Sequence, residues 1–159
     1  MVLSMVVLLI PIALVVFVFR ARGGEDAVVV DPSAAIIQAQ QAKAFPVAAP
    51  TGLPAEWKCV SATFTRAASG ATLRIGYVAP DGGGVQLIES SEPVDALLVR
   101  ELGDNVRPIG TVAAGGATWD SFQARGAETA LVFKGEVRTL IVIGHAPIDQ
   151  LVVLAGSLR

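Results

Sequence analysis

The N-terminal part of the chain is a long run of apolar residues. Positions 2–19 contain no charged side chain, only Ser4 among them is polar, and Pro11 lies near the middle. At about 1.5 Å per residue, a helix of this length covers roughly 27 Å, enough to cross a thin bilayer. Membrane helices tolerate proline because neighbouring groups can satisfy the carbonyl that it leaves free. The pattern therefore predicts a transmembrane helix over residues 2–19.

A cleaved signal peptide is the alternative interpretation of this run, and it fits the flanking residues less well. Signal peptides begin with a basic stretch and end at small residues. No basic side chain precedes this run, and Phe19–Arg22 is not a small-residue cleavage site. Cys59, the one cysteine of the chain, is too far downstream for lipid attachment next to the run. We therefore expect an uncleaved single-pass anchor, with its basic flank, over residues 1–22.

A short tether and a helix are predicted next. Gly23 and Gly24 begin a flexible tether over residues 23–30. Asp31 can cap a helix and Pro32 suits its first position, so a helix is expected from there to Ala44. The proline-rich segment 45–54 is expected to be extended and rich in turns.

From Trp57 onward, apolar residues recur with a period of two, which is typical of half-buried strands. Three strands and a helix ending at Gly103 are predicted, and three strands and a helix follow again after the turn at Gly115-Gly116. The predicted strands lie near residues 57–65, 73–78, 85–90, 119–124, 128–133 and 138–143, and the predicted helices begin at Pro93 and Pro147.

The two helix starts resemble each other. Residues 92–99 read EPVDALLV and residues 146–153 read APIDQLVV, with four of eight positions identical. One interpretation is a duplication of residues 57–103 and 117–158. The other is convergence, because proline at the first position and an acid in the first turn suit any helix. The predicted fold class is α+β: an antiparallel sheet built from two β-β-β-α halves, with the helices packed on one face, in a domain over residues 31–159.

Composition and charge exclude several classes of protein. The chain is 53% hydrophobic with 12 basic and 14 acidic residues. This composition excludes a disordered chain and a basic nucleic-acid binder. A single cysteine excludes a disulfide scaffold. Arg20 and Arg22 follow the apolar run, so the positive-inside rule favours a cytoplasmic domain, unless the natural start lies upstream and adds basic residues before the span.

The residues with catalytic potential do not form a recognisable motif. His145 is the one histidine, and Asp149 follows it at a predicted helix start, but no nucleophile motif accompanies them. Cys59 and His145 alone are too few for a zinc site. The glycine-rich stretch Pro80–Gly84 lies between two predicted strands, so it indicates a hairpin turn rather than a phosphate loop. We therefore predict no catalytic, cofactor-binding or metal-binding residue, and no enzyme.

Aromatic residues offer a second kind of candidate. Trp57, Tyr77, Trp119 and Phe122 could line a ligand groove, although such residues more often belong to the core.

Short motifs in a fixed order run along nearly the whole chain, although each alone is weak. They are the apolar N-terminus, Val30-Asp31-Pro32, Phe45-Pro46-Val47, Pro50–Pro54 with Trp57, Leu73–Val78 with Pro80-Asp81-Gly82, Trp119, and the stretch from Ile143-Gly144 to Leu158. Together these motifs make the chain resemble an actinobacterial family of membrane-anchored proteins, the domain of unknown function 4245. The resemblance implies a single-pass envelope protein with an exported C-terminal domain, and it brings no activity, cofactor or catalytic residue.

Three functions remain as hypotheses from the sequence. The first is a non-catalytic, extracytoplasmic module, anchored in the bilayer through residues 2–19, that interacts with an envelope protein. The second is a binder of an apolar ligand, such as a lipid, on an open face of the sheet; a polar face would count against it. The third, least favoured, is a hydrolase that uses His145 with a serine or Cys59. None of them involves nucleic acid.

Overall fold

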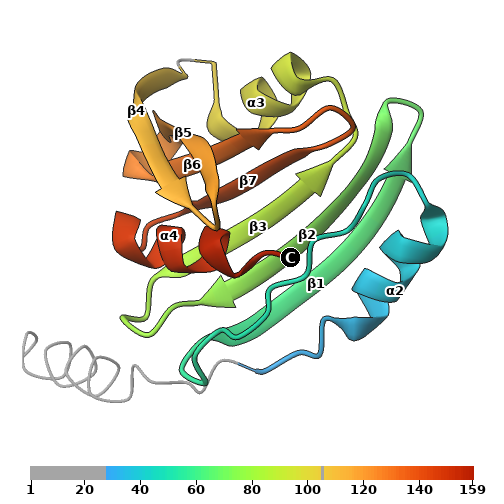
Figure 1. The fold of residues 1–159 in the computed structure, drawn as a ribbon, viewed down its shortest axis with the longest axis horizontal. Helices are drawn as coiled ribbons and strands as arrows, with labels where there is room; N and C mark the ends of the chain where they lie inside the picture. The colour runs from blue at the N-terminus through green and yellow to red at the C-terminus, as the bar shows by residue number, and fades with distance from the viewer. Residues whose placement is uncertain (1–27, 105) are drawn as a thin grey trace, which may run out of the picture.

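Seven strands form one antiparallel sheet in the described part of the chain, which covers residues 28–104 and 106–159 of a computed structural model (Figure 1). The order across the sheet is β1-β2-β3-β7-β6-β5-β4, and each neighbouring pair is antiparallel. The strands are β1 Lys58–Ala67, β2 Gly70–Val78, β3 Gly84–Ser90, β4 Arg107–Ala114, β5 Ala117–Gln123, β6 Thr129–Lys134 and β7 Thr139–Gly144. The helices are α2 Ser33–Ala42, α3 Val94–Leu102 and α4 Ile148–Ser157, with a short 3₁₀ turn, η1, at Arg125–Ala127.

The predicted transmembrane segment, residues 2–19, lies outside the described residues. Within the described ranges, no helix is long and apolar enough to cross a membrane. The anchor therefore stays a prediction from the sequence.

The α+β class and the antiparallel sheet are confirmed, and so are the predicted helix starts. Pro32, Pro93 and Pro147 directly precede α2, α3 and α4. Asp31 accepts a hydrogen bond from the backbone N–H of Ser33 at 2.9 Å, which satisfies a free donor of the first turn of α2. Gly103 ends α3 with a φ of 101°, a conformation that favours glycine.

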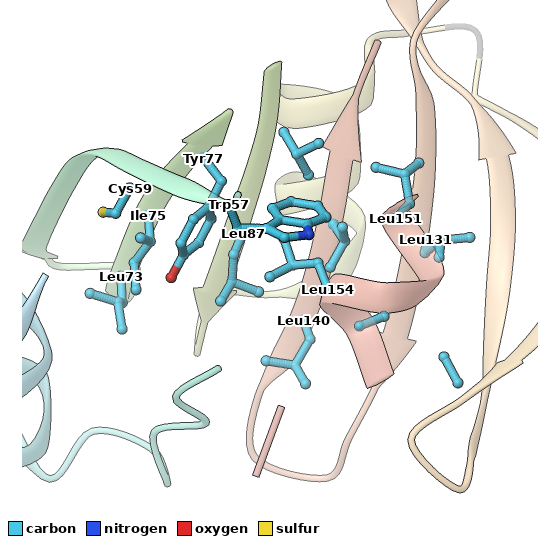
Figure 2. Close-up of a cluster of buried hydrophobic side chains, with 14 of the residues drawn as sticks. Trp57, Cys59, Leu73, Ile75, Tyr77, Leu87, Leu131, Leu140, Leu151 and Leu154 are labelled. Atoms are coloured by element: carbon cyan, nitrogen blue, oxygen red, sulfur yellow. The ribbon is translucent and has the colours of Figure 1, made fainter. Parts of the chain in front are cut away.

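The helices cover both faces of the sheet, so the prediction that they pack on one face is wrong. On the α4 face, Leu151 and Leu154 join one buried cluster with Leu87 and Leu131 (Figure 2). Buried residues of α2 belong to the same cluster. On the α3 face, Leu97 and Leu102 of α3 join a second cluster with Ile88, Val132, Ile141 and Ile143. The central strands are apolar on both sides, and a sheet of this kind needs a helix on each face to bury both.

The two β-β-β-α segments are therefore not arranged as equivalent copies. The β5–β7 segment differs from the β1–β3 segment in three ways. Its strands follow the opposite order across the sheet, β7 runs antiparallel to β3, and α4 packs on the opposite face from α3. Because the three reversals together change the handedness of the segment, no rotation superimposes one segment on the other. The duplication stays a prediction about ancestry, and the similar helix starts have a sufficient local cause.

Strand β4 was missed by the sequence prediction. It lies at the edge of the sheet, and its residues from Arg107 to Thr111 are exposed. Pro108 lacks a backbone N–H, and the register with β5 shifts between Pro108 and Gly110. Proline, a bulge and high exposure are typical of edge strands, and together they hide the period of two.

Segment 45–54 lies against the sheet on the α4 face and connects two distant parts of the chain. Phe45 and Ala48 are buried in this segment. The Ala48 N–H donates to Oε2 of Glu89 in β3 at 3.0 Å, and Thr51 N–H donates to the Ser157 carbonyl at 2.9 Å. The segment thus fastens the end of α4 to the sheet.

Candidate functional site

A polar cleft of about 480 Å³ opens on the α3 face. Its lining comes from β2, β3 and β7, from the end of α3, and from the loops that follow β5 and β7. Because charged side chains line it from several sides, we take it as the candidate functional site.

The floor of the cleft is hollow because two neighbouring strands carry glycine there. Gly76 of β2 and Gly84 of β3 both line it. A Cβ placed on Gly84 would meet nothing within 4 Å, so its position faces open space. A Cβ on Gly76 would meet the hydroxyl oxygen of Ser61, so a side chain there would require Ser61 to move. Ile143 of β7 adds an apolar part to the floor.

One wall is a salt bridge between the sheet and α3. The Arg74 guanidinium in β2 binds both carboxylate oxygens of Glu101, with Nη1 donating to Oε2 at 2.9 Å. Arg74 also donates to the Gln86 side chain at 3.2 Å, and Arg100 donates to Glu101 at 2.8 Å. Burial opposes ionisation of Glu101, but the hydrogen bonds from Arg74 and Arg100 outweigh it and lower the pKa of this carboxyl.

The opposite wall consists of Arg125, Glu128 and His145. His145 Nδ1 lies 3.3 Å from a carboxylate oxygen of Glu128, and its Nε2 lies 3.1 Å from the Gly126 carbonyl. Arg125 donates to the Glu101 carbonyl at 3.1 Å, so it satisfies a free carbonyl at the end of α3. Arg125 therefore links the two walls.

The residues singled out from the sequence for catalysis do not assemble into a catalytic group. His145 contacts Glu128 rather than Asp149, and both ring nitrogens face acceptors of the protein. Cys59 belongs to the buried cluster on the opposite face, and desolvation raises the pKa of its thiol, which disfavours the nucleophilic thiolate. Among the described residues, no group of three histidine, cysteine or acidic side chains could hold a metal ion.

The four candidate aromatic residues belong to the core. Trp57, Tyr77, Trp119 and Phe122 are all buried, and Trp57 packs edge-on against Tyr77 with 6.2 Å between ring centroids. Tyr77 also borders the cleft. These side chains therefore stabilise the fold rather than form an aromatic groove.

The α3 face of β1 does not suit an apolar ligand. Register with β2 places Ser61, Thr63 and Thr65 on this face, next to Gly76, Arg74 and Thr72. The three β1 residues are exposed. The large exposed aliphatics that a lipid binder needs are therefore not found at these positions.

Most residues of the cleft were missed by sequence reasoning. Two signals for them existed. Arg74 and Gly76 share a face of a strongly alternating strand, and Glu101 stands in the last turn of a helix, where the dipole disfavours an acid and a basic partner is to be expected. Gln86, Arg125 and Glu128 gave no such signal, because tertiary packing alone brings them to the cleft.

The comparison with known families covers the whole domain. The model of the family described as protein of unknown function DUF4245 matches residues 1–158. The chain belongs to this family. The match includes every strand of the sheet and all residues of the cleft, so the cleft lies within the part of the chain that defines DUF4245 membership. None of the curated proteins matches the chain.

Proposed function

We propose that this DUF4245 protein is a single-pass membrane protein whose exported, non-catalytic α+β domain binds a component of the cell envelope. The observation that carries the proposal is the uncharged run of residues 2–19, joined by a short tether to a domain with a polar cleft. The bilayer is its first partner, and an envelope protein is the candidate second partner.

The cleft supports binding rather than catalysis. Its charged side chains are tied to one another or to backbone carbonyls, as in the Arg74–Glu101 and His145–Glu128 pairs. Catalysis of acyl transfer needs a nucleophile within hydrogen-bond reach of a base. The ring nitrogens of His145 instead lie next to the Glu128 carboxylate and the Gly126 carbonyl.

Topology is the first property to test. Alkaline phosphatase is fused after Arg159, and a fluorescent protein that matures only in the cytoplasm is fused at the same place in a parallel strain. We expect an active phosphatase and a dark fluorescent fusion, because an exported domain carries its C-terminus outside. The reverse pattern would mean that Arg20 and Arg22 hold the domain in the cytoplasm, and the envelope function would be abandoned.

A second experiment tests the partner. A photo-crosslinking amino acid replaces Gln86 in the cleft, and in a control it replaces Ile37, which is half exposed on α2. The proposal expects an envelope component captured reproducibly from position 86 and not from position 37. Equal capture from both positions, or none from either, would contradict a binding role for the cleft.

A further inference from the structure

The charges that line the cleft cancel. The Arg74–Glu101 pair on one wall faces Arg125 and Glu128 on the other, so two positive and two negative side chains line the same space. An anion that approached either arginine would therefore also meet a carboxylate, and a cation would also meet a guanidinium. A neutral molecule avoids both repulsions, so the electrostatics of the cleft favour a ligand without net charge.

The lining also alternates hydrogen-bond donors with acceptors. Arginine only donates and ionised glutamate only accepts, while Gln86 does both. A hydroxyl group both donates and accepts, so a molecule with several hydroxyls can satisfy the two kinds of group at once. An apolar ligand would displace water from these polar groups without offering them a hydrogen bond, which costs free energy.

The position of the cleft disfavours a peptide. Its floor is formed by the face of β2, β3 and β7, which are inner strands of the sheet. The backbone groups of these strands pair with their neighbours on both sides. A peptide that adds itself to a sheet needs a free edge, and the cleft offers none.

Gly84 keeps the cleft open without being required by the fold. Its φ lies outside the left-handed region, and a side chain at this position would meet no atom within 4 Å. Any larger residue could therefore occupy the strand here, and its side chain would enter the cleft. This position gives a way to fill the site while leaving the core unchanged.

We propose that the cleft on the α3 face binds a neutral saccharide, with the side chains of Arg74, Gln86, Glu101 and Glu128 bonding to its hydroxyls. The proposal rests on the binding of an envelope component proposed above, and it assigns a saccharide rather than a protein to the cleft. Volume agrees with it, since about 480 Å³ lies within the range of small-molecule sites.

The test uses the full chain in micelles of a detergent without a sugar headgroup. Saturation-transfer NMR is recorded with maltose, cellobiose and N,N′-diacetylchitobiose, and separately with citrate, spermidine and the neutral tripeptide Gly-Ser-Gly blocked at both ends. The variant Gly84→Trp fills the cleft. Thr65→Trp places the same side chain on the same face of the sheet, outside the cleft lining. Circular dichroism compares the fold of both variants with that of the wild type.

We expect a saturation-transfer signal from at least one saccharide, which Gly84→Trp reduces to background and Thr65→Trp leaves unchanged. Retention on insoluble cell-wall polysaccharide that only Gly84→Trp abolishes, without a signal from the disaccharides, would support a glycan chain as the source of the saccharide.

Three results would overturn the proposal. The first is that neither a saccharide nor the polysaccharide binds. The second is that saccharide binding persists in a folded Gly84→Trp variant. The third is that citrate, spermidine or the peptide gives a signal that Gly84→Trp blocks, while no saccharide does. Crosslinking from position 86 and the topology fusions do not depend on these probes. Failure of the saccharide is therefore distinguishable from failure of the proposed function.

Discussion

At the scale of single residues, Glu89 is the most unusual group in the described part of the chain. Its side chain is fully buried in β3, and Oε1 has no hydrogen-bond partner. Oε2 accepts from the Ala48 N–H at 3.0 Å and from Arg138 at 3.3 Å. Desolvation raises the pKa of Glu89 to about 7 against the opposing effects of these two partners.

The raised pKa predicts how stability depends on pH. The folded state holds the proton of Glu89 more tightly than the unfolded chain, whose glutamate titrates near 4.5. The contribution of Glu89 to the free energy of unfolding is therefore present below about pH 4.5 and is lost as pH rises to about 7. The loss amounts to roughly 3 kcal/mol at most, from about 1.4 kcal/mol per unit of pKa.

Urea unfolding across this pH range measures the effect. We expect Glu89→Gln to flatten the profile between pH 4.5 and 7, because the amide cannot titrate. Glu136→Gln is the matched control, since Glu136 is exposed on the turn between β6 and β7, and it should keep the slope of the wild type. A Glu89→Gln profile as steep as that of the wild type would show that another group causes the slope.

At the scale of elements, α3 is joined to the sheet by a polar network as well as by its apolar face. Arg74 of β2 binds Glu101, Arg100 binds both Glu101 and Glu92, and Glu92 accepts from the Thr72 hydroxyl at 3.1 Å. Glu101 is nearly buried, while Arg74 is 31% exposed. The network fixes the end of α3 over β2, and this placement defines one wall of the cleft.

Removing one member of the Arg74–Glu101 pair should destabilise the domain. We expect Glu101→Ala to lower the free energy of unfolding by about 1–3 kcal/mol, since it leaves a partly buried guanidinium without its carboxylate. The double variant Arg74→Met/Glu101→Leu should recover part of this loss, because it removes both charges. Chemical denaturation of Arg74→Met, Glu101→Leu and the double variant gives the coupling energy. Strictly additive losses would mean that the pair contributes nothing as a pair.

In strand β1, one inserted residue changes the face of the sheet on which the following side chains lie. The register with β2 shifts between Cys59 and Ser61. Cys59 and Ala62 therefore contact the same core, although a strict period of two would place them on opposite faces. Such a bulge turns Ser61 and Thr63 to the α3 face, where they border the region of the cleft.

At the scale of the whole molecule, local signals predicted the elements and tertiary contacts decided their assembly. Proline starts, glycine ends and alternation located the three described helices and six of the seven described strands. The faces on which α3 and α4 pack were not predictable from the sequence. Both helices begin with nearly the same residues, yet they pack on opposite faces of the sheet. The cleft was not predictable for the same reason, since Arg74, Glu101 and Glu128 are far apart in the chain.

The order of the strands makes a prediction about local opening. β3 and β7 lie at the centre of the sheet with a helix on each side, while β4 lies at an edge with most of its residues exposed. Amides of β3 and β7 should exchange with solvent only when the whole domain unfolds, and outward-facing amides of β4 should exchange fastest among the strands. Hydrogen–deuterium exchange of the full chain in micelles, followed by mass spectrometry, measures this order.

A protein dilution series makes that measurement decisive. In an isolated chain, the exchange rates of β4 should not change with concentration, because its free edge has no partner to lose. Protection of β4 equal to that of β7 at high concentration, and lost on dilution, would show that a second copy pairs with this edge. Equal protection that persists at all dilutions would contradict the edge position of β4 itself.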